Sequence, residues 1–127
     1  MPKPGPDIPT GGFRVPLLFD REPYIIICDP AGPHGPVQFA VLGTKDFDPR
    51  TLVRKSIRFG NASAAKARTY AYRDVNRDGH MDLTLQFNLQ DVFRKLDWRN
   101  TKALRFLGTT NARVDVVGEV LVEMQMR

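Results

Sequence analysis

The sequence predicts an all-β protein, an antiparallel β-sandwich of about seven to eight short strands with an extended arm at its N-terminus. Three observations predict this class. Short apolar runs separated by turn residues recur from residue 13 to the C-terminus. Two runs, within residues 81–89 and 119–125, largely alternate apolar with polar side chains, as strands with one buried face do. Nine of the ten prolines lie in the first 36 residues and none follows Pro49, so most of the chain lacks the residue that interrupts sheets.

Residues 1–12 form the predicted arm. They include Pro2, Pro4, Pro6 and Pro9, and proline disfavours both helix and central strand because it fixes φ and removes the amide donor. The arm also has little core of its own to fold around. We therefore expect it to contact another chain, either a protein partner or a second copy in a homo-oligomer. The remaining residues, 13–127, have the size of a single domain that buries its own core.

The predicted strands follow the arm in order. They are residues 13–19, 24–28, 37–42, 56–59, 69–72, 81–89, 103–107 and 113–126, the last with a break near Gly118. In 81–89 the apolar residues are expected in the core (Met81, Leu83, Leu85, Phe87, Leu89), and the polar residues are expected to face water (Asp82, Thr84, Gln86, Asn88). Only residues 90–96 predict a helix, of a turn or two, because Val92, Phe93 and Leu96 fall on one helical stripe.

Residues 74–82 have the spacing of a calcium-binding loop. Asp74, Asn76 and Asp78 supply oxygen side chains at loop positions 1, 3 and 5, and Gly79 stands at position 6, where such loops bend sharply. Calcium takes about six to eight oxygen ligands. Asp82 would add a carboxylate, directly or through water, and His80 would add its backbone carbonyl and not its imidazole.

The loop is predicted to be carried by strands. An EF-hand is excluded because it needs a bidentate glutamate at position 12, where this chain has Leu85. The alternative to metal binding is an Asx-rich turn in which polar residues and Gly79 tolerate left-handed backbone angles. Three aspartates in one loop repel one another unless a cation neutralises them, so the predicted role of Ca²⁺ is structural. Arg77 either points to solvent or pairs with a ligand carboxylate and weakens the site.

From Pro36 onward the chain resembles a β-sandwich module that recurs in secreted and surface proteins of bacteria. The matching residues are 36–44, 46–48, 56–60, 74–83, 85–87 and 104–108 before Gly118. The resemblance implies an all-β, non-catalytic module and carries over Asp74, Asn76, Asp78 and Asp82 as ligand positions. Proteins of this kind usually have glycine where Arg77 stands and are typically acidic and exported, whereas this chain is basic. A small stand-alone relative with an arm would also suit a virion, as a capsid-decorating protein.

The positive charge of the chain is concentrated in one stretch. The formal net charge is +5, and residues 49–73 contain no acidic residue but seven basic ones: Arg50, Arg54, Lys55, Arg58, Lys66, Arg68 and Arg73. Such a stretch attracts an acidic partner. A solvated strand face is favoured over a nucleic-acid-binding domain acting through residues 50–73, because basic residues alone define no groove contact. Both interpretations stay open.

Few residues could carry catalysis. Cys28 follows three isoleucines, as a core strand residue would, and neither His34 nor His80 lies in a nucleophile motif. The chain has no G-x-S-x-G motif and no glycine-rich phosphate loop. One cysteine and two histidines are also too few for the usual four-ligand Cys/His zinc site. We therefore expect that the protein is not an enzyme.

Taken together, these patterns predict a non-enzymatic structural protein, a calcium-stabilised subunit or cement of a larger assembly such as a decorated capsid. The alternative is a secreted or cell-surface binding module for carbohydrate or protein, and the third hypothesis is a nucleic-acid-binding domain. No apolar run reaches the ~18 residues of a membrane span, and residues 1–7 lack the apolar core of a signal peptide. We expect no membrane span, and the favoured location is a virion or the extracellular surface.

Overall fold

The part of the chain that the structure describes forms ten strands in two sheets. The structure is a computed structural model that describes residues 13–60, 67–94 and 98–126. The predicted arm, residues 1–12, and the basic residue Lys66 lie outside these ranges. The strands are β1 (Phe13–Arg14), β2 (Leu17–Leu18), β3 (Tyr24–Asp29), β4 (Gly32–Pro33), β5 (Pro36–Val41), β6 (Arg58–Gly60), β7 (Thr69–Arg73), β8 (Asp82–Asn88), β9 (Ala103–Thr109) and β10 (Asp115–Met126). One α-helix, α1 (Leu89–Val92), and three 3-10 helices, η1 (Pro49–Thr51), η2 (Arg54–Ser56) and η3 (Trp98–Asn100), complete the described elements.

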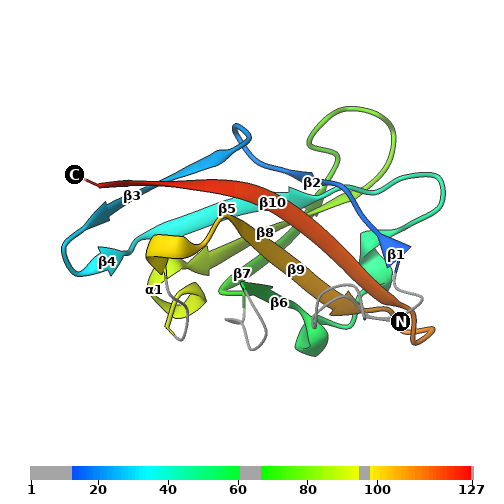
Figure 1. Cartoon of the computed structure of the whole chain (residues 1–127). Helices are drawn as coiled ribbons and strands as arrows, with labels where there is room; N and C mark the ends of the chain where they lie inside the picture. The colour runs from blue at the N-terminus through cyan, green and yellow to red at the C-terminus, as the bar shows by residue number, and fades with distance from the viewer. Residues whose placement is uncertain (1–12, 61–66, 95–97, 127) are drawn as a thin grey trace, which may run out of the picture.

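The two sheets confirm the predicted all-β, sandwich-like fold. One sheet has the order β4-β3-β10-β9-β6, with β1 also paired to β10, and the other has the order β2-β5-β8-β7. Strand β10 crosses the whole molecule (Figure 1). It pairs with β9 antiparallel on one side, and with β1 and then β3 parallel on the other. The other ladders are antiparallel.

A cluster of phenylalanines joins the sheets. Phe39 and Phe87 come from the four-stranded sheet, and Phe59 and Phe106 come from the other; each is at most 3% exposed. The rings of Phe39 and Phe59 lie 4.6 Å apart between centroids, and those of Phe59 and Phe87 lie 5.2 Å apart. Tilted and offset aromatic pairs at such distances add roughly 0.5–1.5 kcal/mol each beyond the area they bury. The sandwich core is therefore centred on rings contributed by both layers.

Met81, which was expected in the core, precedes β8 and is partly exposed; from Asp82 to Leu89 the predicted alternation is confirmed with one exception. Leu83, Leu85, Phe87 and Leu89 are buried, and the side chains of Thr84, Gln86 and Asn88 are partly exposed. The exception is Asp82, which was expected to face water but is 0% exposed. The prediction was wrong because alternation along a strand cannot show that other loops fold over the end of that strand.

The predicted break near Gly118 is also wrong. Strand β10 is continuous for 12 residues, and Gly118 pairs with Phe106 in its middle. A Cβ atom at Gly118 would lie 2.7 Å from Cγ of Leu17. Glycine is present here because Leu17 of β2 packs against the strand, and not because the strand stops.

The predicted helix is shorter than expected. Helix α1 covers only residues 89–92, and the side chain of Asn88 caps it by accepting a hydrogen bond from the Gln90 amide at 3.0 Å. Val92 and Phe93 are buried as predicted, whereas Leu96 lies outside the described residues. Within the described ranges no helix has the length and apolar character that crossing a membrane would require.

Candidate metal site

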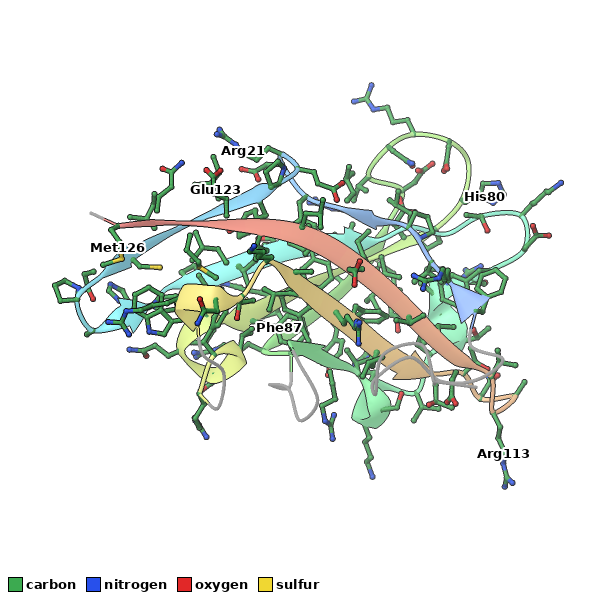
Figure 2. The ribbon with its side chains drawn as sticks, viewed as in Figure 1. Arg21, His80, Phe87, Arg113, Glu123 and Met126 are labelled. Atoms are coloured by element: carbon green, nitrogen blue, oxygen red, sulfur yellow. The ribbon has the colours of Figure 1, made fainter. Side chains whose placement is uncertain are left out.

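The predicted calcium loop connects the adjacent strands β7 and β8. The last residue of β7, Arg73, is paired with the first residue of β8, Asp82, so the ladder closes the loop at its base. Residues 74–81, which include the labelled His80, project from the end of the four-stranded sheet (Figure 2). Both ends of the loop are therefore fixed by antiparallel pairing, which is the strand-carried form that the sequence predicts.

Asp82 anchors the loop to the rest of the sandwich. Its Oδ1 accepts a hydrogen bond from the Gly43 amide at 2.8 Å, and its Oδ2 accepts one from the Val75 amide at 2.9 Å. These bonds compensate for burying the carboxylate, since a buried polar group without partners is costly. A Cβ atom at Gly43 would overlap the carbonyl oxygen of Met81. Glycine thus allows the segment after β5 to approach Asp82 closely enough to donate.

Asp74 and Asp78 organise the exposed part of the loop. The carboxylate of Asp74 accepts the amides of Asp78 at 3.2 Å and Gly79 at 2.8 Å, and Oδ1 of Asp78 accepts the His80 amide at 2.9 Å. The last of these bonds is the main cause that lowers the pKa of Asp78 below its ordinary value of 3.8. Arg77 has a φ of 58° and Gly79 a φ of 88°, so both adopt the left-handed conformation.

The oxygen atoms of the loop converge on one point. One carboxylate oxygen from each of Asp74, Asp78 and Asp82 lies within 4.8 Å of the other two. One of the two terminal atoms of the Asn76 side-chain amide faces these carboxylates, at 3.0 Å from Oδ1 of Asp78 and 3.1 Å from Oδ1 of Asp74. A nitrogen at this position would donate to both carboxylates, whereas an oxygen there would need a cation between the groups. Carboxylate and amide oxygens are the donors that Ca²⁺ prefers, and each carboxylate oxygen that accepts one hydrogen bond retains a lone pair.

The chemistry of these residues fits calcium. Ca²⁺ accepts a flexible set of oxygen ligands, and the loop offers side chains of Asp74, Asn76, Asp78 and Asp82 together with the carbonyl of His80. Among the described contacts Arg77 forms no ion pair with these carboxylates. Its guanidinium therefore does not compete with a cation for them, which was one of the two alternatives for this residue. In the described residues no other cluster of three or more acidic, histidine or cysteine side chains has this geometry.

The described basic residues that were predicted to bind a partner are spread over η1, η2, β6 and the two ends of β7. Arg50 forms a bidentate ion pair with Asp48, at 2.8 and 3.0 Å, and this pair lowers the pKa of Asp48. The guanidinium of Arg54 stacks over Tyr70 and Tyr72 of β7, at 5.0 and 5.7 Å from the ring centroids. The others occupy η2, β6 and the two ends of β7: Lys55, Arg58, Arg68 and Arg73.

Sequence reasoning missed a groove beside the loop. It has a volume of about 420 Å³ and is lined by residues 44–48, Arg50 and residues 79–81. The two walls come from residues 44–50 and residues 79–81, which are far apart in the chain, so no local pattern indicates the groove. The hydrogen bond from the Gly43 amide to Asp82 was missed for the same reason, because it also joins two distant segments of the chain.

Comparisons with known proteins give no relative: no family model, curated protein or solved structure matches this chain.

Proposed function

We propose that the protein is a non-enzymatic β-sandwich stabilised by Ca²⁺ in the loop of residues 74–82, and that it acts as a structural subunit or cement of a larger assembly. The observation that carries the proposal is that one carboxylate oxygen from each of Asp74, Asp78 and Asp82 lies within 4.8 Å of the other two. In this role the cation neutralises the mutual repulsion of the carboxylates, and the loop does no chemistry of its own.

The state of the one thiol supports a non-catalytic role. Cys28 is 0% exposed, and burial, assisted by the charge of Asp29, raises its pKa above the ordinary value of 9.0. A thiol must ionise and meet its substrate to act as a nucleophile. Cys28 instead lies 3.8 Å from the sulfur of Met124, inside the apolar core.

Calcium binding is tested by thermal unfolding in EDTA and in millimolar Ca²⁺. A ligand that binds only the folded state stabilises it by about 2.7 kcal/mol at roughly 100 times Kd. For a domain of this size that corresponds to a rise in Tm of roughly 10 °C. Asp78→Ala should abolish the rise, and Asp20→Ala, which removes an exposed aspartate in another loop, should keep it. No rise in the wild-type protein would leave the loop as an acidic turn and contradict the proposal.

The assembly role has a separate test. Light scattering of the full chain should give a mass above that of one chain, or the protein should co-purify in stoichiometric amount with its assembly. A variant lacking residues 1–12 should lose this association while its Tm stays within a few degrees. Association that survives the deletion would contradict the proposed contact through the arm.

The groove beside the loop favours one second candidate, a secreted or cell-surface module that binds carbohydrate or protein. Its walls mix charged and apolar side chains, and Gly79, His80 and Met81 join it to the calcium loop. A module of this kind would bind its ligand in a calcium-dependent way without residues 1–12. Calcium-dependent retention of the arm-deleted variant on a glycan array would favour this candidate over the assembly subunit.

A further inference from the structure

Strand β7 forms an edge of the four-stranded sheet that the described residues leave unpaired. It stands last in the order β2-β5-β8-β7, and no strand of the described residues pairs with its outer side. The hydroxyl of Thr84 donates to the carbonyl of Ala71 at 3.1 Å, so the Ala71 carbonyl points toward β8. Because successive residues of a strand direct their backbone groups to opposite sides, the amides and carbonyls of Tyr70 and Tyr72 point outward. These are the groups that a further strand would need.

The basic side chains around this edge have no acidic partner among the described residues. Arg68, immediately before β7, and Arg73, at the end of β7, are both exposed. Helix η2 contributes two more basic residues, Arg54 and Lys55, and Arg54 stacks on Tyr70 and Tyr72 of the strand. In the described part of the molecule, no carboxylate lies within ion-pair distance of any of these four. Arg50 and Arg94, by contrast, each pair with an aspartate. The β7 edge therefore carries uncompensated positive charge.

The aromatic residues of the edge disfavour a nucleic acid as the partner. Proteins that bind single strands offer exposed aromatic faces on which bases stack. Tyr70 and Tyr72 are only partly exposed, and both rings already carry the Arg54 guanidinium. The Tyr70 hydroxyl also donates to the Arg54 carbonyl at 3.4 Å, which holds the 3-10 helix against the strand. The stacking surfaces are thus occupied within the chain.

From these observations we infer that the β7 edge binds an extended acidic segment of a partner protein as an added strand. The backbone groups of Tyr70 and Tyr72 would pair with the segment, and Arg68, Arg73 and Arg54 would meet its carboxylates. The arginines lie on both faces of the edge, because Arg54 stacks on Tyr70 and Tyr72 whereas Arg73 follows Tyr72 directly and points to the opposite face. A segment that spans β7, roughly 17 Å, therefore needs acidic residues on both of its faces. The inference rests on the proposed function, because a subunit of a larger assembly must bind another protein of that assembly.

A defined probe tests this inference. We would label a 12-residue peptide of repeated Glu-Glu-Thr-Thr, which as a strand carries glutamates on both faces, and measure its binding by fluorescence anisotropy, in Ca²⁺ and in EDTA. Replacing Arg68→Gln together with Arg73→Gln should weaken binding about tenfold. The matched control is Arg21→Gln with Arg113→Gln, which gives the same net charge but alters exposed residues at opposite ends of the molecule (Figure 2). It should change binding less than twofold.

Two further ligands separate strand addition from simple charge attraction. The same peptide N-methylated at every residue keeps its carboxylates but cannot donate to a strand, and it should bind at least about tenfold more weakly. A 12-nucleotide oligo-dT should bind more weakly than the acidic peptide. The inference is overturned by absent peptide binding, by equal losses in the two double variants, by equal binding of the methylated peptide, or by tighter binding of the oligonucleotide. Any of these outcomes leaves the calcium-dependent melt intact, so failure here is distinguishable from failure of the proposed function.

Discussion

At the scale of single residues, the acidic side chains of the loop have different roles. Asp82 is fully buried and bonded to two backbone amides from separate segments, whereas Asp78 is exposed and bonded within the loop. Both are candidate ligands, but only Asp82 also holds the loop to the segment after β5. The structure therefore separates a residue needed for folding from one needed mainly for the metal.

This difference predicts that two variants lose different amounts of stability in the absence of calcium. Asp82→Asn should destabilise the protein by about 1–3 kcal/mol even in EDTA, because an amide nitrogen would face a buried backbone donor. Asp78→Ala should cost clearly less in EDTA, because the residue is exposed. Urea denaturation measures both free energies of unfolding. Equal costs in EDTA would contradict the separate roles.

Arg77 is a second residue whose environment makes a prediction. A non-glycine residue in the left-handed region is strained by roughly 1 kcal/mol, and Arg77 has a φ of 58°. Arg77→Gly should therefore raise the free energy of unfolding by up to about 1 kcal/mol, offset in part by the greater freedom of glycine in the unfolded chain. Arg77→Ala is the control, because alanine would keep the strain. A gain of equal size in both variants would point to the charge of Arg77 and not to its backbone.

The pH dependence follows from two aspartates. The pKa of Asp48 is lowered mainly by its side-chain bond to Arg50, and that of Asp78 mainly by the His80 amide. Because the folded pKa lies below the unfolded value of about 3.8 in both cases, each ionised carboxylate stabilises the fold above that value. This contribution is lost as the pH falls through the lower, folded pKa. Urea midpoints between pH 6 and pH 2 should fall mainly below pH 4, and a fall centred above pH 5 would contradict this assignment.

At the scale of elements, β10 organises the larger sheet because it pairs with β1, β3 and β9. Its middle must accept the side chain of Leu17 from β2, which belongs to the other sheet. This close contact explains why Gly118, a residue of low strand propensity, occupies the centre of β10.

Gly118→Ala tests this contact. The new methyl group would lie 2.7–3.0 Å from Leu17 carbon atoms, and overpacking of this kind costs about 1–3 kcal/mol. Combining it with Leu17→Ala should cost less than the sum of the two single changes, since the second removes the atoms that clash. A double-mutant cycle in urea measures the coupling. Strict additivity would show that Leu17 is not what excludes a side chain at Gly118.

At the scale of the whole molecule, the phenylalanine cluster couples the calcium loop to the far sheet. The loop adjoins β8, which contributes Phe87, and Phe87 contacts Phe59 of β6. Trp98 lies against Gly32 of β4, in the other sheet, and packs on the same core. We therefore expect the two sheets to unfold together.

A comparison of two probes tests this cooperativity. Trp98 is the single tryptophan, so its fluorescence reports on the six-stranded sheet, and far-UV circular dichroism reports on both sheets. The two melting curves should coincide, and calcium should shift both by the same amount. A calcium shift confined to the dichroism signal would mean that the sheets unfold separately.

The sequence by itself determined the class of fold, the positions of most strands and the composition of the loop. Alternating residues such as Leu83, Leu85 and Phe87 point to one face whatever surrounds them, because the side-chain period of a strand is a local property. The order of Asp74, Asn76, Asp78 and Gly79 is equally local. These features depend only on neighbours along the chain.

Only the tertiary structure decided which distant segments meet. It buried Asp82 under the amides of Gly43 and Val75, kept β10 continuous through Gly118, and paired Arg50 with Asp48. Among the described residues it left the basic side chains of the β7 edge without carboxylate partners. It also formed the groove between residues 44–50 and 79–81. The physical reason is that burial, close packing and ion pairing depend on contacts between residues far apart in sequence, which periodicity and spacing do not record.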